Sequence, residues 1–199
     1  MTTSTKNLAT MAKQSDLSNI IHALKDGGLV LLPTDTVWSI ACNSTDPVAI
    51  HRLRRLKEEY NPYDLELLVH SINMLKQYAT RLHPRLETLL LYHARPLTIV
   101  TEQTQQLPVP ITSEEGSVAI RLTRDLYCKA IIETLGVPLL TASANCSGHP
   151  VPNHFGSIRS DIIEGVDYVS KHRREDLSNG QLAVMVQLSE KDELLFLRE

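Results

Sequence analysis

Two hydroxyls and a carboxylate directly follow an early apolar run in this chain. The run covers residues 29–32, and Thr34, Asp35 and Thr36 come just behind it. A short apolar run predicts a buried strand, and Pro33 ends that strand because proline lacks a ladder N–H group. Hydroxyls two residues apart on extended backbone share one side, where they can bind a small polar ligand such as an amino acid. A capped turn between two strands also accounts for the cluster.

A second polar cluster follows another predicted strand, 138–142, far along the chain. Ser143 and Asn145 flank a small residue there, and small residues at a strand end let backbone approach a ligand closely. Both side chains could reach phosphate oxygens or the edge of a base. The alternative is an ordinary turn built from Ser, Asn and Gly. Since α/β folds bind ligands in a crevice at strand ends, we expect the two clusters to form one pocket.

Basic residues supply a third element of the candidate site. Arg52, Arg54, Arg55 and Lys57 lie on one predicted helix, and Lys57 stands at its carboxyl end beside a polar loop. Most of this run also suits a solvated helix face. Arg121 lies inside an alternating strand, where an inward-facing arginine needs either a bound anion or a carboxylate partner. Both alternatives stay open for it.

The chain offers little for other kinds of site. Its eight histidines show no metal-ligand spacing, and His149 and His154 fall on a turn-rich stretch. Neither standard glycine-rich phosphate loop is present, nor is the Gly-x-Ser-x-Gly turn of a hydrolase nucleophile. Nothing near Cys146 in the sequence lowers the pKa of its thiol, so we expect a packed cysteine. We also expect no protein-bound transition metal.

The composition is that of a globular domain. The chain has 199 residues, 42% hydrophobic and 22% charged, enough for one domain with an ordinary core. A formal net charge of −3 does not indicate a general polyanion binder, although a local basic groove is compatible with it. Three cysteines without paired spacing argue against a disulfide framework, and no apolar run is long enough to span a membrane. With no apolar signal core at the N-terminus, we expect a cytoplasmic protein.

Strands and helices must position these residues, and they interleave along the chain. Residues 1–14 are polar and expected to be flexible, ahead of one domain at 15–199. The pattern predicts helices at about 17–24, 47–57, 72–80, 84–93, 125–135 and 157–163. It predicts strands at 29–32, 37–42, 65–69, 97–101, 117–122, 138–142, 166–169, 182–188 and 194–198. This alternation indicates an α/β protein, and the late run of strands favours a mixed sheet with flanking helices.

Taken in order, these motifs resemble the YrdC-like family, which includes threonylcarbamoyl-AMP synthase. The resemblance runs from about Ser18 to Arg198. The segments that carry it are Gly27-Gly28, Pro33-Thr34-Asp35-Thr36-Val37, Lys57, Pro96-Leu97-Thr98, Val118-Ala119-Ile120-Arg121 and Ser143-Ala144-Asn145-x-Ser147-Gly148. The resemblance implies a twisted mixed α/β sheet around a concave, usually electropositive cavity.

Family enzymes join threonine, bicarbonate and ATP into threonylcarbamoyl-adenylate and release pyrophosphate, for the threonylcarbamoyladenosine modification of transfer RNA. The resemblance implies roles for six residues and Mg²⁺ as the companion of ATP. Lys57 is the catalytic candidate, Thr34, Thr36 and Arg121 are the substrate-binding candidates, and Ser143 and Asn145 are the nucleotide-binding candidates. It also implies transfer RNA or double-stranded RNA and tRNA-modification proteins as partners, and no membrane.

Several polar positions depart from the family pattern. The family usually reads Lys-x-Arg-Pro and then Lys-Pro-Leu, whereas Glu59 stands at the arginine position and Tyr63 at the second lysine. Trp38-Ser39 replaces Tyr-Gly, and His93-Ala94-Arg95-Pro96 replaces Trp-Pro-Gly-Pro. Ala183-Val184 replaces Ser-Thr, which removes two hydroxyls expected near the nucleotide phosphates. Losing one charged partner at a partly buried site costs about 2–5 kcal/mol.

The hydrophobic strands are therefore kept while polar residues have changed, and three functions stay open. The first is a divergent protein that keeps a nucleotide- or double-stranded-RNA-binding cavity but has lost part of the catalytic set. The second is an active threonylcarbamoyl-AMP synthase in which Arg54, Arg55 or Arg95 replaces the missing cations. The third is a non-catalytic paralogue that binds partners in the modification machinery.

Overall fold

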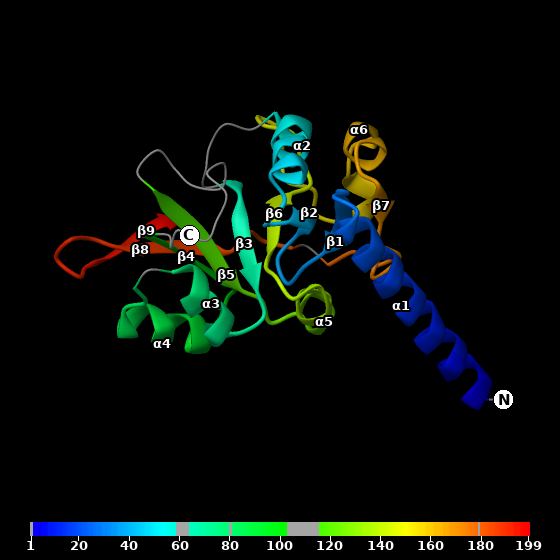
Figure 1. The fold of residues 1–199 in the computed structure, drawn as a ribbon, viewed down its shortest axis with the longest axis horizontal. Helices are drawn as coiled ribbons and strands as arrows, with labels where there is room; N and C mark the ends of the chain where they lie inside the picture. The colour runs from blue at the N-terminus through cyan, green and yellow to red at the C-terminus, as the bar shows by residue number, and fades with distance from the viewer. Residues whose placement is uncertain (1, 59–63, 80, 103–115, 179) are drawn as a thin grey trace.

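The computed structural model describes residues 2–58, 64–79, 81–102, 116–178 and 180–199. Within them, nine strands form one sheet (Figure 1). The strands are β1 (Val30–Pro33), β2 (Trp38–Asn43), β3 (Glu66–Val69), β4 (Leu97–Glu102), β5 (Ser117–Leu122), β6 (Leu139–Ser143), β7 (Tyr168–Val169), β8 (Val184–Leu188) and β9 (Leu194–Arg198). Their order across the sheet is β7-β1-β2-β6-β3-β5-β4-β8-β9.

Helices flank this sheet along its length. They are α1 (Thr2–Lys25), α2 (Pro47–Lys57), α3 (Ile72–Tyr78), α4 (Pro84–Tyr92), α5 (Leu126–Leu135) and α6 (Ser160–Glu164). α1 packs against α5 and the strands β1, β2 and β7, whereas α3 packs on β3 and β5 and α4 on β4. None of the helices in the described residues is both long enough and apolar enough to cross a lipid bilayer.

The sheet is mixed, as the sequence predicts. β1–β7, β3–β5 and β4–β8 pair in parallel, and the remaining neighbours are antiparallel. Pro33 lies opposite Trp38, and Ser39 lies opposite Ser143. This register places the end of β1, the start of β2 and the end of β6 side by side. The polar clusters that follow β1 and β6 therefore meet at one edge of the sheet.

Capping residues set the bounds of the helices around the site. The Asp46 carboxylate accepts a hydrogen bond from Val48 N at 2.9 Å, with a proline in the first turn of α2. Asp125 caps α5 in the same way through Cys128 N at 2.8 Å. Gly136 follows α5 with a φ of 81°, a left-handed conformation that favours glycine. Both helices thus begin and end close to where the sequence predicts.

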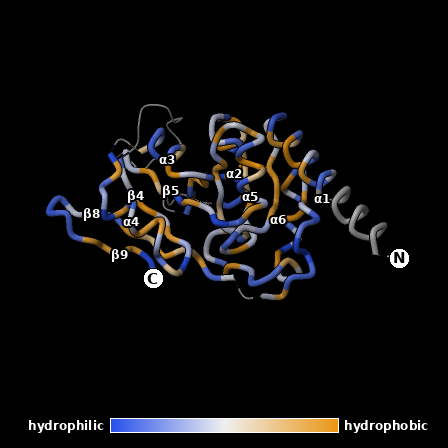
Figure 2. The backbone as a smooth tube through the Cα atoms, turned by 90° about the horizontal axis from the view of Figure 1, so that it is seen from below, coloured by the Kyte–Doolittle hydropathy of each residue, from blue (hydrophilic) through white to orange (hydrophobic). Residues whose placement is uncertain are grey.

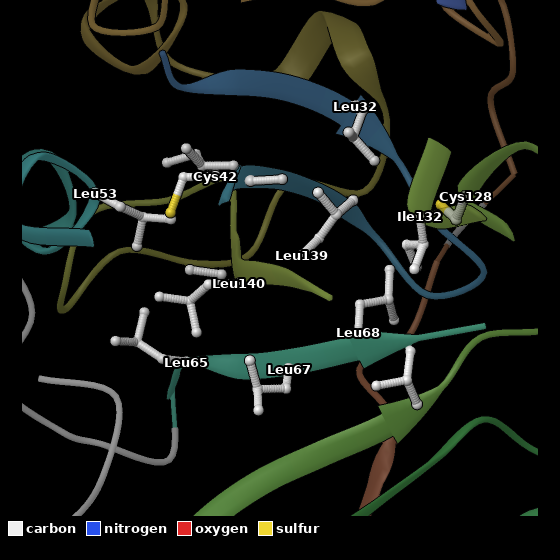
Figure 3. Close-up of a cluster of buried hydrophobic side chains, with 14 of the residues drawn as sticks. Leu32, Cys42, Leu53, Leu65, Leu67, Leu68, Cys128, Ile132, Leu139 and Leu140 are labelled. Carbon is white, nitrogen blue, oxygen red and sulfur yellow. The ribbon is translucent and has the colours of Figure 1, made fainter. Parts of the chain in front are cut away.

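One continuous core joins the sheet to its helices. Leu67 of β3 and Leu140 of β6 are fully buried at its centre, with Leu53 of α2 and Ile132 of α5 beside them (Figure 3). Polar residues lie along the outer loops, such as the β8–β9 turn, while apolar stretches lie inside (Figure 2). Burial of this apolar surface is the main force that holds the elements in place.

Two elements differ from the prediction. α1 begins at Thr2 rather than near residue 17, so residues 2–14 continue that helix. Whether this part of α1 is flexible stays a prediction. The helix predicted at 157–163 is divided into a 3₁₀ turn (Phe155–Ser157) and α6, because Ile158 between them has extended backbone (φ −73°, ψ 132°).

Truncating a central core residue tests this packing. Leu67 is 0% exposed, so Leu67→Ala leaves a cavity, and we expect the free energy of unfolding to fall by about 2–5 kcal/mol in urea denaturation. Leu126→Ala removes the same atoms where the side chain is 81% exposed, and should change that free energy by less than about 0.5 kcal/mol. Equal losses in the two variants would contradict the assignment of the core.

Candidate active site

A cavity of about 320 Å³ opens where β1 ends and β2 begins. Its lining comes from the turn 33–38, from Arg95, from Asn153, and from the chain between β7 and β8, including Arg173 and Asp176. Hydroxyl, amide, cationic and anionic groups therefore border one space. Its volume lies within the range of pockets that bind small molecules.

A smaller pocket of about 30 Å³ adjoins this cavity. The two spaces share Thr36, Val37 and Leu182 as lining residues. Arg121 and Ser143 line the smaller one. Residues from both polar clusters and from the alternating strand β5 thus border two adjoining spaces, called the joined site below, whereas Lys57 and Asn145 are not among the lining residues of either.

The turn after β1 serves both the backbone and the cavity. Thr34 Oγ1 lies 2.9 Å from Thr36 Oγ1 and donates to Val37 O at 2.9 Å. Thr36 N donates to Thr34 Oγ1 at 3.1 Å. Thr34 is 4% exposed, whereas Thr36 is only partly buried and borders both spaces. The capped turn and the presentation of a hydroxyl to a ligand are therefore compatible, since Thr34 supports the turn on which Thr36 is displayed.

Lys57 binds the second polar cluster. Its side chain is buried, and its Nζ donates to Ser143 O at 3.0 Å and to Asn145 O at 2.9 Å. The same Nζ lies 3.3 Å from Ser143 Oγ, and that hydroxyl donates to Asn145 Oδ1 at 2.6 Å. α2 ends at this lysine, and Glu58 turns the chain away with a φ of 54°. The ammonium thus orders the loop after β6 and places a positive charge beside its oxygens.

Arg121 lies between two carboxylates. It is 1% exposed, its Nε donates to Glu66 Oε2 at 2.9 Å, and its Nη1 donates to Asp35 Oδ1. Of the two alternatives for an inward-facing arginine, the structure supplies the carboxylate partners. A ligand anion at Arg121 stays a prediction.

Further contacts extend this pairing into a network. Glu66 Oε1 accepts from Arg198 Nη2 at 2.7 Å and from Thr98 Oγ1 at 3.1 Å. Asp35 Oδ2 accepts from Arg124 N at 3.0 Å. Two cationic and two anionic side chains thus meet beside the smaller pocket, namely Arg121, Arg198, Asp35 and Glu66. They join the turn after β1 to β3, β5 and β9.

The charges in this network stabilise one another. Burial raises the pKa of Glu66, but the guanidinium groups of Arg121 and Arg198 outweigh burial and hold that pKa below its usual 4.5. Burial lowers the pKa of Arg121, but the carboxylates of Glu66 and Asp35 raise it overall. Glu66 and Arg121 are thus charged at neutral pH.

Some positions that depart from the family pattern border the same site. Arg95 and Trp38 line the larger cavity, and Ala183 lines the smaller pocket. Of the arginines expected to replace missing cations, Arg95 is the one that borders the joined site within the described part of the chain. Glu59 and Tyr63 lie outside the described residues.

Three further contributors were missed by sequence reasoning. Glu66 begins an otherwise apolar strand, and a carboxylate in a buried strand needs a cation, so its position was a usable signal. Arg173 and Asp176 lie in a mixed-charge stretch without helix or strand pattern. Only the tertiary structure brings that stretch to the turn after β1.

The described residues contain no group of three or more histidine, cysteine or carboxylate side chains placed to hold a metal ion together. Magnesium that accompanies a nucleotide is held largely by phosphates and water, with one or two carboxylates. Asp64 borders the smaller pocket together with Ser143 and is a carboxylate that could serve in this way. The residues present therefore fit Mg²⁺ bound with ATP.

Glu66→Gln removes the carboxylate that both arginines share. Unpairing buried charges costs about 3–5 kcal/mol, and we expect the free energy of unfolding at pH 7 to fall by about that amount in denaturant titration. Because the folded-state pKa of Glu66 is depressed, its stabilisation is complete above 4.5 and is lost as pH falls through the lower folded value. The gap between the wild type and the variant should therefore narrow below pH 4.5.

Glu87→Gln is the matched control for this experiment. The Glu87 carboxylate lies 3.0 Å from Lys76 Nζ in a solvent-accessible pair, so its loss should cost less than about 1 kcal/mol. A gap for Glu66→Gln that stays constant down to pH 3 would contradict the assigned ionisation.

Comparisons with known proteins place this chain in a family. A family model described as "Telomere recombination" (Sua5, YciO and YrdC) matches residues 22–199. Threonylcarbamoyl-AMP synthase of Xanthomonas euvesicatoria pv. vesicatoria (strain 85-10) is 25% identical over 162 residues, which are 80% of this chain and 87% of that protein.

Two solved structures show the same fold. P. abyssi Sua5 complexed with L-threonine matches with a TM-score of 0.78 at 23% identity, over 92% of this chain and 53% of that one. This chain thus spans about half the length of that protein. E. coli YciO matches with a TM-score of 0.80 at 18% identity, over 92% of this chain and 88% of that one. The predicted mixed α/β sheet with flanking helices is confirmed, and the chain belongs to the Sua5/YciO/YrdC family.

Proposed function

We propose that this chain binds threonine and ATP in the joined site and forms threonylcarbamoyl-AMP from threonine, bicarbonate and ATP. The observation that carries the proposal is the convergence of Thr36, Arg121 and Ser143 on adjoining spaces, with Lys57 holding the loop from Ser143 to Asn145. A relative named threonylcarbamoyl-AMP synthase and a structural neighbour with bound L-threonine support it.

The larger cavity suits the amino acid. Threonine carries a carboxylate, an amino group and a hydroxyl, and each needs a partner of matching chemistry when it leaves water. Arg95 offers a cation for the carboxylate, and Thr36 offers a hydroxyl that donates and accepts. Asp176 offers an anion on the same wall. The lining therefore matches a zwitterion better than an apolar ligand.

The loop after β6 suits the nucleotide. Lys57 fixes the carbonyls of Ser143 and Asn145, so the loop is ordered before a ligand arrives. The lysine also keeps a positive charge beside Ser143 Oγ, at 3.3 Å. A fixed cation near the site of phosphoryl chemistry stabilises negative charge without reorganisation during the reaction.

The proposed reaction balances as a condensation followed by an adenylyl transfer. The threonine amine and bicarbonate form a carbamate and release water, and a carbamate oxygen then bonds to the α-phosphorus of ATP as pyrophosphate leaves. Mg²⁺ bound to the phosphates would supply charge neutralisation. The task of this chain is to hold the carbamate and the α-phosphate in line, which Thr36 and the loop from Ser143 would do from the two sides of the joined site.

Arg95 favours this activity over a binding-only protein. Its side chain borders the cavity at a position where the family pattern has no arginine. The family pattern has two cations after Lys57 that this sequence lacks. Arg95 therefore supplies one cation in their place. A divergent protein that binds nucleotide without chemistry remains the alternative, because Ala183 replaces a hydroxyl beside the smaller pocket.

Release of pyrophosphate from threonine, bicarbonate, ATP and Mg²⁺ tests the activity. We expect release to require all three substrates, and Lys57→Met to lower its rate by about 100-fold or more because the loop loses its fixed cation. Arg55→Met, at an exposed position of the same helix, should leave the rate unchanged. Calorimetry that shows threonine and ATP binding without any release would instead favour the binding-only alternative.

Thr36→Val tests the amino-acid end of the site. The change keeps the shape of the side chain and removes its hydroxyl, so we expect the threonine Kd to rise by about tenfold in calorimetry, the loss of one hydrogen bond. Thr134→Val makes the same change at an exposed position of α5 and should have no effect. If both variants bind threonine as the wild type does, Thr36 does not contact the amino acid.

Binding of transfer RNA, double-stranded RNA or modification proteins stays a prediction from the resemblance. Of the described basic residues, Arg52 on α2 pairs with Asp167 at 2.9 Å and Arg121 pairs with two carboxylates, so part of the positive charge is already neutralised. A gel-shift titration at low and high salt would test RNA directly, because phosphate contacts weaken steeply with added salt.

A further inference from the structure

A buried carboxylate lies outside the joined site and takes no part in the function proposed above. Asp16 of α1 is 3% exposed and accepts hydrogen bonds from Tyr168 Oη at 2.7 Å, Ser170 Oγ at 2.8 Å and Lys171 N at 3.0 Å. Tyr127 Oη of α5 donates to it as well. No described cation forms an ion pair with it. Neutral donors from two separate segments, α5 and residues 168–171, thus converge on one charge.

This carboxylate is ionised in spite of its burial. Burial raises the pKa of Asp16, but the hydrogen bonds from the tyrosine and serine hydroxyls and from Lys171 N outweigh burial and hold the pKa below its usual 3.8. An ionised acceptor makes stronger hydrogen bonds than a neutral one. Asp16 is therefore a strong tie between α1 and the chain that follows β7.

The chain that follows β7 forms a wall of the larger cavity. Residues 170–178 and 180–182, called the strap below, run from β7 toward β8 without helix or strand structure. Ser170 and Lys171, which both donate hydrogen bonds to Asp16, are the first two residues of the strap. Arg173, Asp176 and Leu182 of the strap line the cavity.

The strap is fitted closely to the turn after β1. Arg173 Nη2 donates to Thr34 O at 2.5 Å, and its Nη1 lies 3.2 Å from Asp125 Oδ2. A Cβ at Gly180 would clash with the carbonyl oxygen of Thr36, so this approach requires glycine. A shift of the strap therefore displaces both the cavity wall and the backbone of the turn after β1.

Other contacts of the strap hold it near its start but not at the cavity. Arg174 Nε donates to Ser170 O at 2.7 Å, and its guanidinium lies 4.9 Å from the ring centre of Phe155. The ring of His172 packs at a tilt against that of Tyr127, with 4.3 Å between the ring centres. Tyr127 is itself a partner of Asp16, so the carboxylate organises both the strap and the surface on which it rests.

We propose that Asp16 is a positioning residue for the amino-acid end of the cavity, which it shapes by fixing the first residues of the strap. The inference rests on the proposed function, since it names a residue that supports the threonine site. The family model begins at residue 22 and so does not describe this carboxylate. The second half of α1 is then part of the site architecture.

Limited trypsin digestion tests the anchor without any ligand. Lys171, Arg173 and Arg174 are trypsin sites on the strap. Asp16→Asn keeps the size of the side chain but removes its charge, and we expect cuts at these sites to appear about tenfold faster than in the wild type, well below the unfolding temperature. Unchanged cutting in both Asp16→Asn and Asp16→Ala would overturn the inference.

Kinetics and calorimetry test the consequence for the site. We expect Asp16→Asn to raise the threonine KM and Kd by about tenfold or more and to leave the ATP KM close to the wild-type value, because the strap borders the amino-acid end. Leu24→Ala, a fully buried change on the same helix, is the control for lost stability. Even if Leu24→Ala lowers the Tm as much as Asp16→Asn does, it should leave the threonine KM and the trypsin cutting of the strap unchanged.

The outcomes separate this inference from the proposed function. If the wild type binds no threonine while Asp16→Asn still speeds cutting of the strap, the proposed function fails and the anchoring role stands. If the wild type binds threonine and Asp16→Asn binds it equally well, the positioning role fails. If Leu24→Ala raises the threonine KM as much as Asp16→Asn does, the effect is one of stability, and the positioning role also fails.

Discussion

The pairing of Arg121 with Asp35 and Glu66 is the constraint on which the candidate site depends. In the sheet order, β2, β6 and β3 separate β1 from β5, yet the carboxylate that follows β1 pairs with the arginine of β5. A buried guanidinium without carboxylates would cost far more than the fold can tolerate. The turn after β1 must therefore reach across the sheet, and the cavity forms between that turn and the strap.

This network also determines which charges remain for a ligand. Two guanidinium groups and two carboxylates neutralise one another beside the smaller pocket, so an anion that enters meets little net charge from them. The larger cavity differs, because Arg95 borders it without a carboxylate partner among the described residues. A cation without a carboxylate partner in the described part of the chain can pair with the carboxylate or phosphate of a ligand.

Local patterns explain why so much of the fold could be predicted. The strand at 29–32 and the strand at 138–142 are short apolar runs bounded by proline or polar clusters, and both are strands in the structure. Asp46 and Asp125 are capping residues whose effect reaches only three residues along the chain. The break at Ile158 was missed because it depends on the burial of that side chain in the core rather than on local propensity, and the extension of α1 to Thr2 was missed as well.

In the candidate site, too, local sequence patterns predicted some features and long-range contacts determined the others. By itself, the sequence determined the elements, the two polar turns and the family, since these follow from apolar periodicity and from motifs in order. Only the tertiary structure decided the partners: Glu66 beside Arg121, Lys57 on the loop after β6, and the strap over Thr34. These contacts join residues 55 or more positions apart, and their strength depends on burial that no local pattern encodes. Long-range register, set by the packing of the whole sheet, is the physical reason that the predicted residues meet.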